Sequence, residues 1–234
     1  MSLKIKWIML KSKKSIDELY SLIKSSPYDK TSESGFIRHS FIEGTKVSAT
    51  YVECKKYLSE VQDPFGDVIE QEIVNYYYIE FCIEMVAKGI YLISIFNPPQ
   101  SVRNLITFLS EKLNYEVSFS SLSVDVNKFL SFVISSSNAT SVKVEKLKVS
   151  GLILNRNSKA SIEIVSSSDA SQDILHFIEN KSYTMDRVKA IALNSGNVIK
   201  FELSKSGNVT VQENFADLFE NIIKSYLKVN HFNM

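Results

Sequence analysis

Alternating apolar and polar positions dominate this chain and predict many strands. Between residues 188 and 211, three alternating runs are separated by two polar turns that contain Gly196 and Gly207. That arrangement is typical of a three-stranded β-meander. The same alternation predicts further strands at 3–10, 115–120, 140–154 and 159–165.

Segment 36–96 also has β character and predicts two hairpins. Their turns are expected at Glu43-Gly44 and Lys88-Gly89, where glycine interrupts the alternation. The acidic stretch 59–72 lies between the two hairpins and contains Pro64 and Gly66, which favours an exposed loop.

Helical periodicity appears in fewer places. Ser15 and Glu18 have the spacing of a capping box and precede a short amphipathic stripe. Segment 97–114 predicts another helix, with Asn97 as its cap and Pro98 in its first turn. Helices are also predicted at 123–135, 168–180 and 214–229.

The order of these elements predicts the fold class. The first half has the order β-α-β-β-β-β-α-β, and the second half has the order β-β-α-β-β-β-α. Runs of antiparallel strands with helices packed on one side indicate an α+β fold, here with two related halves. We expect an N-terminal α+β unit at 1–139 and a C-terminal unit at 140–234.

Composition adds the class of protein. The chain has 234 residues, of which 44% are hydrophobic and 23% charged, as in an ordinary globular protein. Cys54 and Cys82 lie in apolar runs and are expected to be buried thiols in a reducing compartment. The first ten residues are too short and too rich in lysine for a signal peptide or a membrane span. We therefore expect a cytoplasmic protein without a membrane partner.

No catalytic motif stands out in the sequence. Glycine-rich phosphate loops, a G-x-S-x-G elbow and zinc-type Cys or His spacings do not occur. The sequence therefore predicts no catalytic residues, no metal site, no cofactor and no enzymatic activity. A metal-dependent nuclease is an alternative, although a solvated loop and a polar sheet face explain its carboxylates more simply. Those carboxylates are Asp63, Asp67, Glu70, Glu72, Glu80 and Glu84.

The cations are unevenly distributed, although the net charge is only +1. Five lysines and no acid occur in the first 14 residues, and a second cluster lies between Lys143 and Lys159. Such clusters could neutralise DNA phosphates, or they could be solvated lysines that keep strand edges from pairing. The predicted DNA-binding residues are Lys143, Lys146, Lys148, Arg156, Lys159, Arg187, Lys189, Lys11, Lys13 and Lys14.

Aromatic residues suggest an alternative function. Tyr76, Tyr77 and Tyr78 open the apolar region 76–96, and tyrosine is enriched at protein interfaces. The chain could therefore be a protein–protein interaction component of an anti-phage or toxin–antitoxin system. A strand with one face in the core also explains these tyrosines.

Three segments resemble the recombination-associated RdgC family. They are "KIKWIML…SIDELYSLIKS", "YYYIEFCIEMVAKGIYLISIFNPPQSVRNLITFLSEKLN" and the strand, helix and meander of 161–211. The last segment also resembles RexA-like phage exclusion proteins. The resemblance implies a non-enzymatic homodimer that binds double-stranded DNA with little sequence preference. It further implies a role in recombination control or phage defence. A second protein of a defence system is the alternative partner that we expect.

Overall fold

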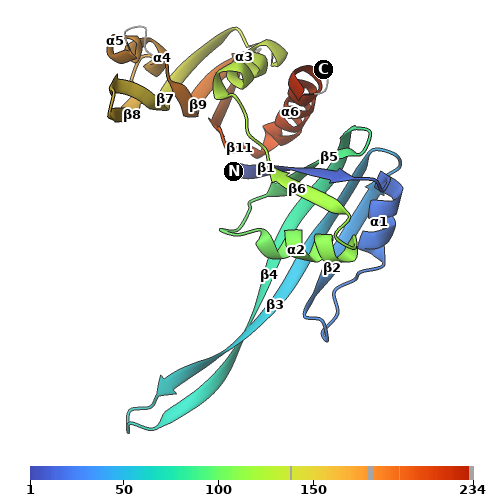
Figure 1. Cartoon of the computed structure of the whole chain (residues 1–234). Coiled ribbons are helices and arrows are strands. Elements are labelled where there is room, and N and C mark those ends of the chain that lie inside the picture. The colour runs from blue at the N-terminus through green and yellow to red at the C-terminus, as the bar shows by residue number, and fades with distance from the viewer. Residues whose placement is uncertain (138, 179–181, 195, 232–234) are drawn as a thin grey trace.

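The computed structural model describes residues 1–137, 139–178, 182–194 and 196–231 (Figure 1). One antiparallel sheet runs through the whole molecule in the order β2-β3-β4-β5-β1-β11-β10-β9-β7-β8, with β6 paired to β1. The strands are β1 (Ser2–Ser12), β2 (Ser34–Ile42), β3 (Lys46–Gln62), β4 (Val68–Ala87), β5 (Ile90–Phe96), β6 (Val117–Ser121), β7 (Ser141–Asn155), β8 (Ser158–Val165), β9 (Thr184–Asn194), β10 (Asn197–Ser204) and β11 (Asn208–Gln212).

The helices pack on opposite faces of this sheet in the two halves. They are α1 (Ile16–Lys24), α2 (Arg103–Lys112), α3 (Val126–Ser136), α4 (Ala170–Asp173), α5 (Leu175–Ile178) and α6 (Ala216–His231), with a 3₁₀ turn η1 (Glu213–Phe215) before α6. On β1, Ile8 and Leu10 join a core with α1 and α2, whereas Ile5 and Trp7 join a core with α3 and α6. Side chains alternate along a strand, so the two cores lie on opposite sides of β1.

The predicted α+β class with a large antiparallel sheet is confirmed. Within each half the main helices cover one face, but the covered face changes at β1, which the sequence did not predict. The sheet is also continuous, because β1 pairs with β5 on one side and β11 on the other. The proposed division at residue 139 stays a prediction.

The expected loop at 59–72 is wrong. β3 and β4 continue as one long hairpin, pairing from Lys46 opposite Glu84 to Gln62 opposite Val68, and the chain turns only at 63–67. Asp63 stabilises this turn, because its Oδ1 accepts hydrogen bonds from the backbone N–H groups of Phe65 and Asp67. We call residues 55–78 the arm, which projects away from the rest of the molecule (Figure 1).

The predicted turns at Gly44 and Gly89 are confirmed, as is the capping box of Ser15 and Glu18. The predicted start of the helix at 97 is wrong. Asn97 has a left-handed backbone (φ 43°), and its Oδ1 accepts a hydrogen bond from the Lys4 N–H at 3.1 Å. It therefore fastens the end of β5 to β1, and the helix begins at Arg103.

The predicted helix at 168–180 is divided into α4 and α5, capped at its start by Asp169; residues 179 and 180 lie outside the described part of the chain. Both cysteines are buried, as expected. None of the described helices has the length and apolar character needed to span a bilayer.

Candidate nucleic-acid interface

In the part of the chain that the structure describes, no helix covers one face of the C-terminal half of the sheet. Val188, Ala190 and Ala192 of β9 point into the core with α3 and α6, so alternate residues of this strand point to the opposite face. The same alternation holds in β10, β11 and β8, and in β1 at Ile5 and Trp7. We call this exposed side of β1, β11, β10, β9, β7 and β8 the open face.

Positive charge is concentrated on the open face. It carries nine cations against three carboxylates, an excess of six in a chain whose net charge is +1. The remainder of the chain therefore has a net charge of −5. The cations are Lys4, Lys6, Lys143, Lys146, Lys148, Lys159, Arg187, Lys189 and Lys200, and the carboxylates are Glu145, Glu163 and Glu202.

Strand register brings these residues together from distant parts of the sequence. Lys4 lies opposite Thr210, Thr210 opposite Glu202, and Glu202 opposite Lys189, so one row crosses four strands. A bulge in β7 between Val144 and Leu147 places two successive residues on the open face, so Lys146 joins it beside Glu145.

Each of the three carboxylates is already paired. Lys146 Nζ lies 2.7 Å from Glu163, Lys189 Nζ 3.1 Å from Glu145, and an Arg187 guanidinium nitrogen 3.3 Å from Glu202. The Lys146 ammonium also lowers the pKa of the Glu163 carboxyl by hydrogen bonding to it. Within the described residues, six cations of the open face have no carboxylate partner: Lys4, Lys6, Lys143, Lys148, Lys159 and Lys200.

A shallow depression of about 510 Å³ lies at one end of the open face. Lys148, Arg187 and Lys205 line it together with Asp186. Leu122 and four serines complete the lining, the serines being Ser121, Ser123, Ser204 and Ser206. Ammonium, guanidinium and hydroxyl donors around one hollow suit a phosphate oxygen.

The structure brings six of the ten predicted DNA-binding residues together on the open face and places the other four elsewhere. Arg156 is exposed in the turn between β7 and β8. Lys11 alternates to the opposite side of β1 from Lys4, and Lys13 and Lys14 lie between β1 and α1. The six on the open face are Lys143, Lys146, Lys148, Lys159, Arg187 and Lys189.

Sequence reasoning did not select three cations that the open face includes. Lys4 and Lys6 were noted only as part of the N-terminal cluster, and Lys200 has no neighbouring cation in β10. They reach the face because β1 pairs with β11 and β11 with β10. Their alternation against apolar neighbours could have indicated a shared face, but not which strands adjoin.

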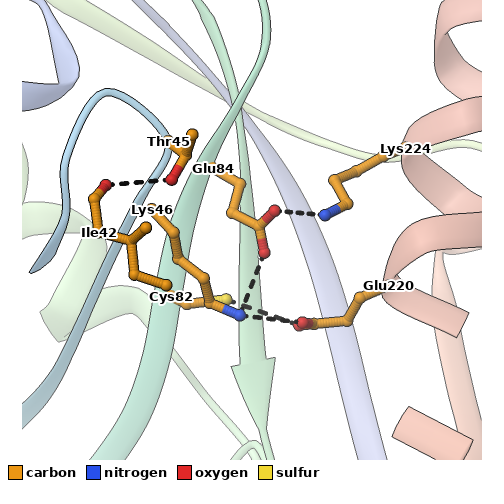
Figure 2. A network of polar contacts seen from close by, with 7 residues as sticks. All are labelled: Ile42, Thr45, Lys46, Cys82, Glu84, Glu220 and Lys224. Atoms are coloured by element: carbon orange, nitrogen blue, oxygen red, sulfur yellow. Dashed lines mark hydrogen bonds and ion pairs between the residues drawn. The ribbon is translucent and has the colours of Figure 1, made fainter. Parts of the chain in front are cut away.

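A second polar cluster joins the two halves of the molecule (Figure 2). Lys46 of β3 lies 3.1 Å from Glu84 of β4 and 3.2 Å from Glu220 of α6. Lys224 of α6 also pairs with Glu84, and the Cys82 thiol lies 3.6 Å from a Glu220 oxygen. We call these five residues the junction cluster, because they connect the β3–β4 hairpin to the last helix.

The charges of the junction cluster balance each other. Burial favours a neutral Glu84, but the ammonium groups of Lys224 and Lys46 outweigh it and hold the pKa of this carboxyl below its usual range. Burial also opposes a charged Lys46, yet its acidic neighbours Cys82, Glu220 and Glu84 raise the pKa of this amine. Burial raises the pKa of the Cys82 thiol to about 12, so that this side chain stays protonated.

The junction cluster contains possible metal ligands, but its two carboxylates already form ion pairs with the amines of Lys46 and Lys224. One ligand atom each from Cys82, Glu84 and Glu220 lies within 4.8 Å of the others. Lys46 bridges both carboxylates, so a metal ion would have to displace this ammonium group. We interpret the cluster as a structural connection.

The six carboxylates considered for nuclease chemistry do not form one site. Asp63, Asp67, Glu70 and Glu72 lie on the arm, and Glu80 is exposed on β4 beyond it. Glu84 belongs to the junction cluster. The arrangement therefore gives no support to a two-metal centre.

Comparisons with known proteins do not identify this chain. No family model and no curated protein matches it. A solved structure described as DynU16, a putative protein in the dynemicin biosynthetic locus, aligns over 94% of this chain and 92% of its own. Its sequence identity is 7% and its TM-score 0.19, values at which the likeness carries no argument about fold or function.

Proposed function

We propose that this protein binds double-stranded DNA without sequence preference through the open face. The observation that carries the proposal is the set of six cations without carboxylate partners on that face. Lysine and arginine contacts to phosphate provide the affinity that does not depend on sequence. No catalytic role is part of this proposal.

The chemistry of the open face favours a duplex over single strands. Proteins that bind single strands without preference combine cations with aromatic side chains on which bases stack. The described residues that alternate onto the open face include no Phe, Tyr or Trp. Six strands spaced about 4.8 Å apart make this face roughly 24 Å wide, which suits contacts to phosphates rather than insertion into a groove.

The resemblance to RdgC-like and RexA-like proteins supplies the rest of the proposal. It suggests a homodimer that acts in phage defence or recombination control in the cytoplasm. It also suggests that each chain consists of two related halves. The net charge of −5 outside the open face is compatible with DNA approaching from the open face alone.

A fluorescence-anisotropy titration with a random duplex at several salt concentrations tests this function. Replacing Lys4, Lys148 and Lys200 together by alanine should reduce the slope of log affinity against log salt by about 3, close to one per lost phosphate contact. A matched variant with alanine at Lys11, Lys13 and Lys14 removes the same charge outside the open face and should leave the slope nearly unchanged. Absence of binding at low salt, or equal losses in both variants, would refute the proposal.

Docking of another protein is a second candidate function, because the arm exposes aromatic side chains. Tyr76, Tyr77 and Tyr78 are 50%, 42% and 59% exposed, whereas most of 79–96 is buried in the core. The surface is therefore the arm, not the region that follows it. Co-purification with a neighbouring gene product that resists high salt and is lost in Tyr76→Ser/Tyr78→Ser would favour this candidate. Loss at moderate salt would count against it.

A further inference from the structure

We call residues 58–72 the distal arm, and all of its charged side chains are carboxylates. Between Tyr57 and Ile73 there are five carboxylates and no lysine or arginine. Among the residues that the structure describes, no cation forms a salt bridge with any of them, although Lys56, which pairs with Glu33, also attracts Glu72 electrostatically. The five are Glu60, Asp63, Asp67, Glu70 and Glu72.

Three of these carboxylates share one face of the ribbon. Glu60 lies directly opposite Glu70, and Glu72 lies two residues further along β4 on the same face. Like charges directly opposite one another destabilise a strand pair. A two-stranded ribbon that projects into water is also only marginally stable. A cationic partner over this face would relieve both costs.

The opposite face of the arm has a different character. Tyr57 lies opposite Ile73 and Val61 opposite Ile69, with the uncharged pair Ser59 and Gln71 between them, so this side is mostly apolar and free of carboxylates from 57 to 73. The two faces would therefore bind chemically different partners, and a salt titration can tell them apart.

The open face has the complementary charge. Six of its cations have no carboxylate partner among the described residues, and three carboxylates without salt bridges, Glu60, Glu70 and Glu72, share one face of the arm. The acidic end of the arm, from Leu58 to Asp63, is about 17 Å long at about 3.4 Å per residue. It therefore fits within the roughly 24 Å span of six strands.

The arm cannot reach the open face of its own chain. It projects from the N-terminal half in the direction away from β7, β8 and β9 (Figure 1). The pairing must therefore join two molecules. If a two-fold axis relates two molecules, the arm of each can bind the open face of the other. Both arms and both open faces are then occupied, and the assembly stops at a dimer.

We propose that the acidic face of the arm docks on the open face of a second copy of this chain and competes there with DNA. The competition with DNA rests on the proposed function, because the arm would pair with the same cations that DNA would contact. DNA binding then releases the arm, and the exchanged dimer is the DNA-free state.

Sedimentation equilibrium of the full chain tests the exchange without any DNA. The chain should dimerise at 50 mM salt, and dimerisation should weaken strongly at 500 mM salt, as expected for exposed ion pairs. Glu60→Gln/Glu70→Gln/Glu72→Gln should weaken dimerisation at least about tenfold. Alanine at Lys4, Lys148 and Lys200 should have a similar effect. An equimolar mixture of the two variants should associate more strongly than either alone, because one intact arm again meets one intact open face.

A matched variant on the other face of the arm keeps the proposal falsifiable. Val61→Thr/Ile69→Thr alters only the apolar side and should leave dimerisation unchanged. A dimer that resists salt and is lost in this variant would overturn the proposal in favour of an apolar interface. A chain that stays monomeric at low salt would overturn it as well.

The DNA measurement separates this inference from the proposed function. The triple glutamine variant should bind a random duplex about tenfold more tightly than the unmodified chain at concentrations where the latter is dimeric. Equal DNA affinities would refute competition while leaving DNA binding intact. A salt-sensitive dimer that depends on both faces but binds no duplex would refute the function and support the exchange.

Discussion

The two halves of this sheet present different surfaces. In the N-terminal half, α1 and α2 cover one face, and the β3–β4 hairpin extends far beyond the core as an acidic arm. In the C-terminal half, α3 and α6 cover the opposite face and leave the cationic open face exposed. The change of covered face at β1 is what leaves Lys4 and Lys6 uncovered. The face that the helices cover in each half therefore determines which charged side chains stay exposed to a binding partner.

The largest effect is expected where the two halves are joined. Glu220→Ala removes one of the two carboxylates that pair with Lys46 and leaves Glu84 as the single carboxylate for the partly buried amines of Lys46 and Lys224. Removing one partner of a buried ion pair costs about 3–5 kcal/mol, and we expect the lower end because Lys46 is about one quarter exposed. Urea denaturation measures the change. Glu213→Gln, an exposed glutamate just before α6, should change stability by less than about 0.5 kcal/mol. Equal effects of the two substitutions would mean that the junction cluster does not hold the halves together.

Two glycines with the same backbone conformation sharpen the comparison between the halves. Gly207 in the β10–β11 turn has φ +67°, and a Cβ there would lie 2.8 Å from the Leu122 carbonyl oxygen. Gly44 in the β2–β3 turn has φ +68° and open space around it. Gly207→Ala should therefore destabilise by about 2–3 kcal/mol, and Gly44→Ala by about 1 kcal/mol. Thermal denaturation of both variants measures the difference, and a smaller loss at Gly207 would contradict the close packing of Leu122.

The halves should also differ in their response to acid. The pKa of Glu84 is lowered in the folded state, so its stabilising contribution is complete above about pH 4.5 and is lost as the pH falls through the lowered value. Stability curves should therefore fall below about pH 4.5, and Glu84→Gln should flatten that part of the curve. The pKa of Glu163 is also lowered, but this carboxyl is exposed, so Glu163→Gln should change the curve much less. A curve unchanged by Glu84→Gln would show that another group controls acid unfolding.

The smallest effect is expected from shortening the arm. Replacing residues 58–72 by Asn-Gly joins Tyr57 to Ile73, which already lie opposite each other, through a favoured two-residue turn. The exposed residues removed belong to neither core, so the free energy of unfolding should change by no more than about 0.5 kcal/mol. Ile83→Ala in the buried part of β4 should instead cost about 2–5 kcal/mol. A large loss on shortening would mean that the arm supports the core directly.

Local sequence signals predicted local structure well in this chain. Alternation located the strands, the glycines at 44 and 89 located two turns, and Ser15 with Glu18 located a helix start. Two local predictions were wrong for physical reasons. Pro64 and Gly66 mark only the tip of the arm, and the polar residues around them still alternate as a solvated ribbon. Asn97 uses its side chain to hold β1 rather than to cap α2.

The candidate site was less accessible to sequence reasoning, because it depends on strand order. Nothing near Lys200 indicates that it shares a surface with Lys4, since their strands meet only through β11. Pairing with carboxylates is equally non-local. Lys146 and Lys189 looked like free cations in the sequence, but Glu163 and Glu145 neutralise them. The cluster of Lys46, Glu84 and Glu220 was missed because β3, β4 and α6 are distant in sequence.

The central position of β1 has a consequence for biosynthesis. Because Ser2 lies opposite Gln212, β1 is translated long before β11 and lacks one of its three partner strands until β11 has been synthesised. Until then its unpaired edge is open to wrong partners, including other nascent copies. Contacts between such distant positions also slow folding. We therefore expect chains that stop before β11 to be substrates for chaperones or proteases.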